Sequence, residues 1–317
     1  MDRPKVTVLM SFRNSARYIL KAAESILNQD YEDFEFLIIN DGSTDASAEI
    51  IASLKDKRIR LIVNRENIGL TKSLILGLGV ARGEYIARMD ADDISYPFRL
   101  SSQLAVLGKN PDISVVGCHY EVIDEEARPL RKRGAVNDNR IIKQLLAKGE
   151  NPLVHGSVVF RKKDAQAIGG YNEKFYYAQD FELWSRMIKR FIFCVVEKPL
   201  YQLRSFSILD KDKYIFQRFY REYISKNCSG TDFVKLPDDL SIRGELDRLY
   251  LAIPKYYTSN YYLWVAKGNI LKNPLYSLKS IYKSFCHAPR LEGKRFLFGK
   301  LLGLFSKNIR ADEKTLL

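Results

Sequence analysis

The amino-acid sequence predicts an α/β fold: a mostly parallel central sheet flanked by helices, followed by a C-terminal helical appendage. Apolar runs alternate with amphipathic helical patterns through residues 1–110, and this order requires parallel pairing through helical crossovers. The runs are apolar throughout, as expected for strands that are covered on both faces. The appendage is predicted because strand patterns stop after Arg204.

The N-terminal elements follow one another in regular order. Apolar runs predict buried strands at 6–10, 34–39, 59–63 and 85–87. Helical periodicity predicts helices over 15–28 and 70–81, and between them a helix capped by Ser43 or Asp45 that ends near Lys55. Pro97 suits the first turn of a further helix that ends near residue 109.

The next hundred residues continue the first domain. Further strands are predicted at 113–124, 158–160 and 194–196, and helices at 140–148 and 180–190, with a polar connection between 124 and 140. We therefore divide the chain into a domain at 1–204 and a helical, basic and aromatic region at 205–317. Prolines interrupt that second region at Pro237, Pro254, Pro274 and Pro289.

Composition excludes several classes of protein. The 317 residues are 46% hydrophobic and 28% charged, which excludes disorder as the dominant state. No apolar run approaches the roughly 20 residues that a transmembrane helix needs, and the N-terminus lacks the pattern of a secretory signal. The four cysteines are too far apart in sequence for a zinc site, so we expect reduced thiols in a cytoplasmic protein.

Polar clusters follow three of the predicted strands, at the edge where open α/β sheets bind ligands. They are Ser11–Asn14, Asn40–Ser43 and Asp90–Asp93. The second cluster alone is equally well explained as an ordinary turn. In the third, three carboxylates in four residues repel one another unless a cation gathers them. Oxygen ligands of this kind suit Mg²⁺ or Mn²⁺ shared with substrate phosphates, although a lone Asp-x-Asp pattern (a DXD motif) is common by chance.

Two later residues are candidates for acid–base chemistry. His155 precedes a predicted strand, and Asp180 opens the helix at 180–190. An isolated histidine is more often structural, and an aspartate at this position could simply stabilise the helix N-terminus. Asp180 could instead be a general base. A dinucleotide site is excluded, because no G-x-G-x-x-G pattern follows the first strand.

Seven segments, taken together, resemble the family 2 glycosyltransferases, whose fold is called GT-A. They occur in that family's order and spacing over about residues 4–204. The segments are VTVLMSFRN (6–14), INDGSTD (39–45), ENIGLTKSL (66–74), GEYIARMDADD (83–93), HGSVVFRKK (155–163), GGYNEKF (169–175) and QDFELWSR (179–186).

The resemblance implies a role for each matched position. Asp41 would bind the nucleotide base, a uracil in a UDP-sugar, with the backbone of Ser11 to Arg13 beside it. Asp90 would lie near the ribose, and Asp92 would bind the Mn²⁺ or Mg²⁺ that bridges the diphosphate. Asp180 would deprotonate the acceptor hydroxyl. Two further candidates are Lys72, near the nucleotide, and His155, as a contact for the acceptor or the diphosphate and the next candidate for the base.

These roles imply a metal-dependent, inverting glycosyltransferase that extends a glycan or polyprenyl-linked acceptor in surface polysaccharide synthesis. A single in-line displacement inverts the anomeric centre, whereas retention by double displacement needs a carboxylate nucleophile that the motifs do not assign. A sugar-nucleotide pyrophosphorylase is the alternative enzyme, but the expected Gly-rich basic loop is missing after the first strand. A nucleic-acid-binding protein is the non-enzymatic alternative. The nearly balanced charge of residues 1–200 disfavours it, and we expect no nucleic-acid partner.

The C-terminal region carries most of the positive charge of the chain. Residues 201–317 contain 21 basic and 11 acidic residues, and seven tyrosines and Trp264 are interleaved with lysines over 250–285. Aromatic rings favour the lipid headgroup region, and basic side chains are attracted to anionic lipid. We expect this region to rest on the inner face of the cell membrane as a peripheral element. The alternative is a helical cap that packs its aromatic side chains on the first domain.

Flotation with liposomes tests this expectation. At low salt, the full chain should float with vesicles that contain anionic lipid, because each basic residue near the surface contributes roughly 1 kcal/mol. A chain truncated near residue 205 should stay at the bottom of the gradient. A full chain that also stays at the bottom would show that the region packs on protein instead.

Overall fold

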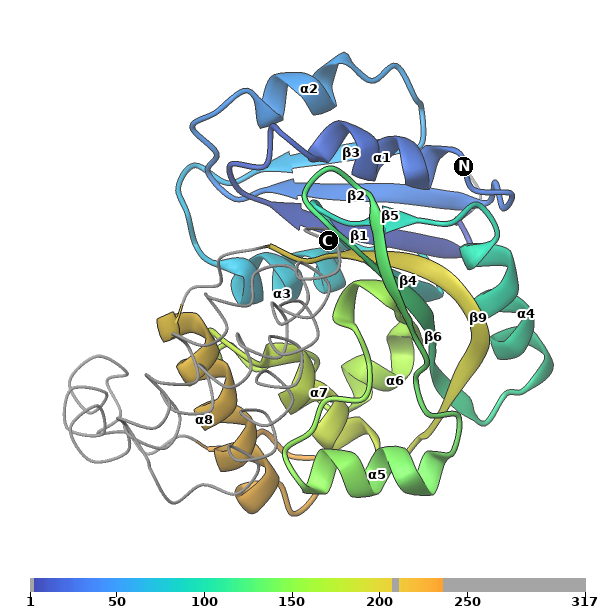
Figure 1. Ribbon diagram of the computed structural model, residues 1–317, viewed down its shortest axis with the longest axis vertical. Helices are drawn as coiled ribbons and strands as arrows, with labels where there is room; N and C mark the ends of the chain where they lie inside the picture. The colour runs from blue at the N-terminus through green and yellow to red at the C-terminus, as the bar shows by residue number, and fades with distance from the viewer. Residues whose placement is uncertain (1–2, 207–210, 236–317) are drawn as a thin grey trace, which may run out of the picture. The chain divides into compact units, whose positions relative to one another are not determined.

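The computed structural model describes residues 3–206 and 211–235, and the side chains of 211–215 are excluded (Figure 1). The chain forms two compact units. The first contains residues 1–208 and Tyr220–Lys235. The second contains Leu209–Phe219 and Leu236–Leu317, and only part of one helix in it is described. Every predicted site residue belongs to the first unit.

The first half of the sheet is parallel, as the sequence predicts. Strand β1 lies between β2 and β4, and β3 pairs with the outer edge of β2, so the order is β3-β2-β1-β4. All seven residues of β1 and of β2 are buried, which confirms the expectation of strands covered on both faces. The bounds are β1 Val6–Phe12, β2 Phe34–Asn40, β3 Ile59–Val63 and β4 Tyr85–Asp90.

Helices cover both faces of this parallel half (Figure 1). Buried residues of α1, among them Ile19 and Ala22, belong to the same core cluster as Val8 and Met10 of β1. On the opposite face, α3 lies close to the sheet because Gly77 has no side chain, and a Cβ there would meet Leu9 and Ile39. The bounds are α1 Ile19–Leu27, α2 Ser47–Ser53 and α3 Leu70–Val80.

The second half of the sheet is mixed. Strand β8 is antiparallel to both β4 and β6, β9 is parallel to β6, and the short strands β5 and β7 are antiparallel to β9 and β6. The bounds are β5 Ile94–Ser95, β6 Ile113–Ile123, β7 Pro129–Arg133, β8 Val159–Arg161 and β9 Ile192–Arg204. The α/β fold is confirmed, with antiparallel pairs confined to the part of the sheet beyond β4.

Three parts of this half differ from the sequence prediction. Strand β7 lies in the segment that the sequence predicts to be a polar connection. It is not predicted as a strand because all five of its residues are exposed and show no apolar alternation. Strand β9 extends well beyond the predicted 194–196. Its full length is not predicted because its middle residues are exposed and interrupt the apolar pattern, and its register with β6 shifts near Pro199. Helix α6, Lys162–Ala167, is short and absent from the sequence prediction.

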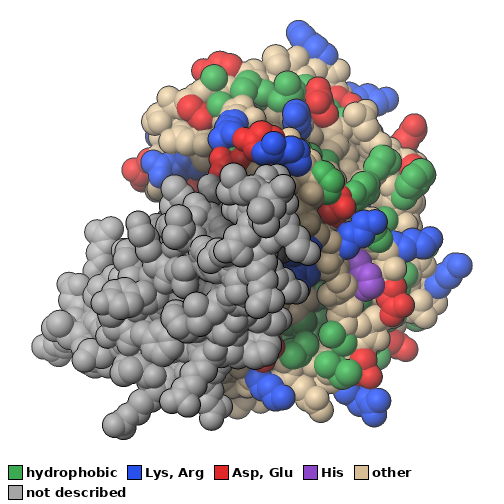
Figure 2. All heavy atoms as spheres, viewed as in Figure 1, with side chains coloured by type: hydrophobic (Ala, Val, Ile, Leu, Met, Phe, Trp, Pro, Cys, Tyr) green, Lys and Arg blue, Asp and Glu red, His purple; other side chains and the backbone are tan. Residues whose placement is uncertain are grey.

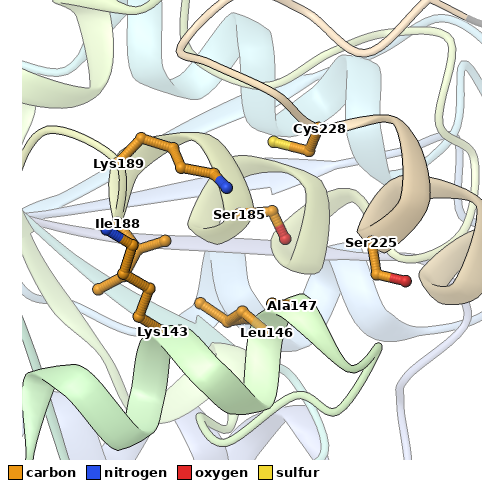
Figure 3. Close-up of a pocket in the computed structure, with 8 residues that line it drawn as sticks. All are labelled: Lys143, Leu146, Ala147, Ser185, Ile188, Lys189, Ser225 and Cys228. Carbon is orange, nitrogen blue, oxygen red and sulfur yellow. The ribbon is translucent and has the colours of Figure 1, made fainter.

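The remaining helices complete the unit. The bounds are α4 Arg99–Lys109, α5 Asn139–Ala147, the 3₁₀ turn η1 His155–Ser157, α7 Gln179–Met187 and α8 Lys211–Asn227. A cavity of about 10 Å³, about the size of one water molecule, lies between α5, α7 and the end of α8 (Figure 3). Ser185 borders it with a buried hydroxyl that has no protein partner among the described residues.

Helix α7 is anchored by a fully buried ion pair. The Nη2 atom of Arg186 lies 2.7 Å from Oε2 of Glu182, and neither side chain is exposed. Arg186 also donates to the carbonyl oxygens of Ile168 and Gly170. Glu182 accepts from the backbone N–H of Val234. The pair therefore ties α7 to the preceding segment at 168–170 and to Val234, 52 residues from Glu182.

The predicted helices beyond residue 235 lie outside the described residues, as does the proposed membrane-facing surface. Within the described residues, no helix is long and apolar enough to cross a membrane. Cys118, Cys194 and Cys228 are free thiols. Because Val234 contacts α7, the truncated control for flotation is better ended after Lys235 than near 205.

Removing one partner of the buried pair should strongly destabilise the fold. Arg186→Met leaves the Glu182 carboxylate buried without its ion-pair partner, so the free energy of unfolding should fall by about 3–5 kcal/mol. Lys226→Met is the matched control, because Lys226 pairs with Glu222 at the same helical spacing but on the surface; roughly 0.3–0.5 kcal/mol is expected there. Urea denaturation measures both. Equal losses would contradict the role given to the buried pair.

Candidate active site

The three predicted polar clusters meet at one edge of the sheet. Ser11 of β1 pairs in register with Asp90 of β4 on one side and with Ile39 of β2 on the other. The backbone N–H of Asp41 donates to the carbonyl oxygen of Phe12 at 2.8 Å. The carboxyl ends of β1, β2 and β4 therefore form a single site, as the alternation of elements predicts.

Side-chain hydrogen bonds join the loops after β1 and β2. The Oδ1 atom of Asn14 accepts from the backbone N–H of Thr44 at 2.8 Å, and the Asn14 N–H donates to Oγ of Ser43 at 3.1 Å. Asp45 accepts from the N–H of Ala16 at 3.0 Å. The second cluster is thus a turn braced against its neighbour, and it also lies at the site.

Asp41 is almost fully buried and organises the loop between β3 and α3. Its Oδ1 accepts from the Asn64 side chain at 3.0 Å and from the Ile68 N–H at 2.9 Å, and its Oδ2 accepts from the Gly69 N–H at 2.9 Å. Gly42 allows the same loop to approach, because a Cβ there would lie 2.7 Å from the backbone nitrogen of Asn67. Both carboxylate oxygens therefore have protein donors, although a carboxylate has about four acceptor positions.

Asp90 is oriented by a buried arginine. The Nη2 atom of Arg88, whose side chain is completely buried, lies 2.5 Å from Oδ1 of Asp90. The other oxygen, Oδ2, faces Gly156 of η1, where a Cβ would lie 2.8 Å away. Arg99, also buried, donates to the carbonyl oxygens of Arg88 and Gly156 and so holds β4 against η1.

The three carboxylates of Asp90–Asp93 do not converge, contrary to the expectation that a cation gathers them. Asp93 points into the protein, where its Oδ2 accepts from the Tyr201 hydroxyl at 2.8 Å and its Oδ1 from the Arg204 N–H at 2.7 Å. Burial, and then the charges of Asp92 and Asp90, raise the pKa of Asp93 well above its usual value. Hydrogen bonds within the protein, and not a shared metal, account for this third aspartate.

The remaining pair, Asp90 and Asp92, fits a metal that is shared with a substrate. Within residues 3–206 and 211–235, no three His, Cys, Asp or Glu side chains are grouped as an all-protein metal site would require. Mg²⁺ and Mn²⁺ sites commonly use one or two carboxylates and complete their coordination with water and phosphate oxygens. The oxygen donors at the end of β4 are consistent with that arrangement.

Asp180 lies at the N-terminus of α7, after Ala178 in a left-handed backbone conformation with φ of 58°. The Nδ2 atom of Asn151 donates to Oδ2 of Asp180 at 2.7 Å. Burial raises the pKa of Asp180, and the negative charge of Asp90 adds to this, while the Phe181 N–H, the charge of Arg221 and Asn151 act in the opposite direction. The structure therefore places a carboxylate of raised pKa at the start of α7, with one of its oxygens held by Asn151.

His155 has structural contacts. Its Nε2 lies 2.8 Å from the hydroxyl of Tyr171, and its ring meets Trp184 edge-on at 6.1 Å. Burial, and then the charge of Arg88, lower the pKa of His155 well below its usual value, so the ring is neutral. Of the other candidates, Ser11 is buried, whereas Arg13 and Lys72 expose their side chains. The role of each in binding stays a prediction.

The order of these motifs along the chain matches that of a known protein family. The family described as glycosyl transferase family 2 matches residues 7–169.

The chain belongs to glycosyltransferase family 2.

Relatives in the family are about one-third identical to the chain over the aligned residues. An uncharacterized glycosyltransferase of Methanocaldococcus jannaschii is 34% identical over 71% of this chain and 80% of its own length. The putative glycosyltransferase EpsE of Bacillus subtilis is 36% identical over 63% of this chain and 73% of its own length. An uncharacterized glycosyltransferase of Haemophilus influenzae is 32% identical over 62% of this chain, which spans 63% of that relative.

Solved structures with the GT-A fold are similar in architecture. TarS 1–349 of S. aureus in complex with UDP-GlcNAc has a TM-score of 0.56 at 16% identity, with 89% of each chain covered. The mannosyltransferase PcManGT of Pyrobaculum calidifontis, in complex with GDP-Man and Mn²⁺, has a TM-score of 0.55 at 18% identity, with 98% of this chain and 88% of that one covered. At these identities the similarity establishes the fold.

Several residues that build the site of this family 2 glycosyltransferase are absent from the sequence prediction. Arg88 and Gly156 lie inside the matched motifs, beside residues with more obvious chemistry. Asn151 precedes a motif. Tyr201 and Arg204 end a strand whose sequence carries no polar cluster. Among these residues, only Gly156 carries a local sequence signal, because a glycine next to the candidate His155 indicates that another segment approaches the backbone closely.

A side chain at position 156 should displace Asp90. Gly156→Ala would place a methyl group against Oδ2 of Asp90 and the Tyr201 hydroxyl, so we expect a loss of about 1–3 kcal/mol of stability and weaker binding of UDP in the presence of Mn²⁺. Gly79→Ala is the control, because nothing lies within 4 Å of a Cβ there. Urea denaturation and calorimetry measure the two effects. Normal UDP binding by stable Gly156→Ala would refute the close packing of this site.

Proposed function

We propose that this glycosyltransferase transfers a sugar from a UDP-sugar, with Mn²⁺ or Mg²⁺, to a hydroxyl of a glycan or polyprenyl-linked acceptor, with inversion at the anomeric carbon. One observation carries the proposal: the carboxyl ends of β1, β2 and β4 bring Asp41 and Asp90 to one edge of the sheet, where the buried Arg88 fixes Asp90. In an open α/β sheet this edge is where ligands bind.

The donor would bind at the common edge of β1, β2 and β4. Asp41 would contact the base through its remaining acceptor capacity, beside the backbone of Ser11 and Arg13, with Lys72 near the nucleotide. Asp90 would lie near the ribose, and Asp90 and Asp92 would hold the cation. A divalent cation held by these residues would supply positive charge to the departing diphosphate. UDP-GlcNAc in TarS and GDP-Man with Mn²⁺ in PcManGT show that proteins of this fold bind such donors.

The proton would be removed by Asp180. An ionised carboxylate of raised pKa is a better base than an ordinary aspartate, and the hydrogen bond from Asn151 to Oδ2 would hold this carboxylate in place while it receives the proton from the acceptor hydroxyl. Attack from the side opposite the leaving diphosphate inverts the anomeric centre. His155 is the neighbour in sequence of Gly156, which packs against Asp90, so it is a further candidate for contact with the acceptor or the diphosphate.

The alternatives from the sequence have less support. Membership of the family favours glycosyl transfer over a sugar-nucleotide pyrophosphorylase. On the face shown in Figure 2, basic and acidic side chains of the described residues are interspersed, without a continuous basic stripe of the kind that binds nucleic acid. The resemblance and the composition of the C-terminal region support an acceptor in surface polysaccharide synthesis and a location on the inner face of the membrane. The flotation experiment tests the membrane binding.

Asp92→Ala should abolish the metal-dependent part of UDP binding, because it removes one of two carboxylate ligands. Calorimetry of UDP binding with and without Mn²⁺ measures this. Asp112→Ala is the control, since Asp112 is an exposed aspartate outside the 90–93 cluster, between α4 and β6. The metal role is wrong if wild type and Asp92→Ala show the same gain in affinity on adding Mn²⁺.

Asp180→Asn should reduce the rate of transfer by about 10²–10⁴, the usual range for loss of a general base, while UDP binding survives. Because the base acts when ionised, kcat/KM should fall as the pH drops through the raised pKa of Asp180. Asn151→Ala removes a hydrogen bond that stabilises the ionised form, so this acid limb should move to higher pH. Transfer by Asp180→Asn at a nearly normal rate would make His155 the candidate base.

A further inference from the structure

The C-terminal end of β9 holds the segment that the proposed function assigns to the metal. The Nε atom of Arg204 donates to the backbone carbonyl of Asp92 at 2.6 Å, and its backbone N–H donates to the side chain of Asp93 at 2.7 Å. These contacts join residues 112 and 111 positions apart. Arg204 is only 6% exposed, so its charge is held away from bulk water.

The same guanidinium binds a second segment, the turn between β6 and β7. Its Nη1 atom donates to the carbonyl oxygens of Asp124 and Glu125, each at 2.7 Å. The guanidinium also stacks on Tyr18, with 4.6 Å between its central carbon and the ring centroid. Three carbonyl oxygens from two segments therefore converge on one planar cation, a geometry that suits arginine and not lysine.

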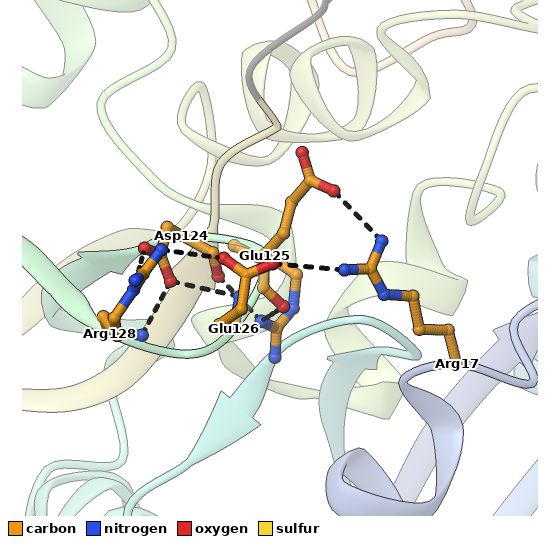
Figure 4. A network of polar contacts seen from close by, with 6 residues as sticks. Arg17, Asp124, Glu125, Glu126 and Arg128 are labelled. Atoms are coloured by element: carbon orange, nitrogen blue, oxygen red, sulfur yellow. Dashed lines mark hydrogen bonds and ion pairs between the residues drawn. The ribbon is translucent and has the colours of Figure 1, made fainter. Parts of the chain in front are cut away.

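The turn is braced independently of Arg204, so it can serve as an anchor. Oδ1 of Asp124 accepts from the N–H groups of Glu126 and Arg128, and Arg128 returns a side-chain contact to Oδ2 at 2.7 Å. On the outer side, Arg17 forms ion pairs with Glu125 and Glu126 (Figure 4). A hollow of about 270 Å³ lies beside these residues, with Arg204 in its lining.

We propose that Arg204 is a positioning residue that fixes the backbone of Asp92 to the Asp124–Arg128 turn and so sets the place of the metal-binding carboxylate. The inference rests on the proposed metal role of Asp92. The side chain of Asp92 starts at the Cα next to the carbonyl that Arg204 holds. Tyr201 and Asp93 restrain the same segment through the Asp93 side chain, whereas Arg204 holds the peptide unit of Asp92 itself.

The test is the Mn²⁺ concentration that half-saturates UDP binding, measured by calorimetry on the full chain. Hydrogen bonds from a charged donor contribute enough free energy to change an affinity about tenfold or more. Arg204→Met should therefore raise the half-saturating Mn²⁺ concentration by about that factor. Saturating Mn²⁺ should restore the wild-type amount of bound UDP. Arg204→Lys keeps the charge without the planar fork and should lie in between.

Arg131→Met is the matched control. Arg131 lies on the exposed strand β7, which follows the same turn, so the variant removes a nearby positive charge but leaves the contacts to the Asp92 carbonyl intact, and its Mn²⁺ requirement should equal that of wild type. A second readout needs neither metal nor nucleotide: amide hydrogen exchange at residues 92–95 should be faster in both Arg204 variants than in wild type and unchanged in Arg131→Met.

Two results would overturn the proposal. If the folded Arg204 variants require no more Mn²⁺ than wild type while Asp92→Ala loses metal-dependent binding, the metal site stands and the positioning role falls. If Asp92→Ala keeps its metal dependence, the metal site itself is wrong and the role given to Arg204 falls with it. Should Arg204→Met fail to fold, the Mn²⁺ requirement and hydrogen exchange of Arg204→Lys decide the matter alone.

Discussion

Three negative charges at the end of one strand must be kept apart, and most of the site depends on how the chain does this. Asp90 is paired with the buried Arg88, and Asp93 is turned inward to the Tyr201 hydroxyl and the Arg204 N–H. Both contacts reduce the repulsion within the cluster, because Arg88 balances the charge of Asp90 and Asp93 is withdrawn into the protein. Asp92 is thereby presented on a segment that is fixed on both sides.

Buried arginines provide the framework for this arrangement. Arg88, Arg99 and Arg186 are fully buried, and each donates to backbone carbonyl groups of other segments. A guanidinium remains charged when buried and has five donors in a plane, so it can join several carbonyl groups at once. Burial lowers the pKa of Arg99, which reflects the cost of holding a cation there. The family fold in this chain is thus held at its centre by polar contacts as well as by apolar packing.

The parallel half of the sheet could be predicted because its signals are local. Apolar runs such as 34–39 are bounded by turns and separated by helical periodicity, and the strand ends then bring Ser11 and Asp90 together by topology alone. Strand β7 could not be predicted, because five exposed residues leave no apolar pattern. Nor could the inward turn of Asp93, since its partners lie more than a hundred residues away and nothing near Asp93 indicates them. The resemblance to the family supplied candidate residues, and the contacts around them came from the structure.

The distance along the chain between Asp92 and Arg204 has a consequence for how the protein is made. Synthesis proceeds from the N-terminus, so the four parallel strands and their helices can leave the ribosome and associate long before β9 exists. During that interval Asp93 has neither of its inward partners, and β5 has no strand to pair with. Closing so long a loop is slow compared with forming local contacts. The nascent chain therefore acquires the parallel half of its sheet first and its finished site last, when Tyr201 and Gln202 pair with β5.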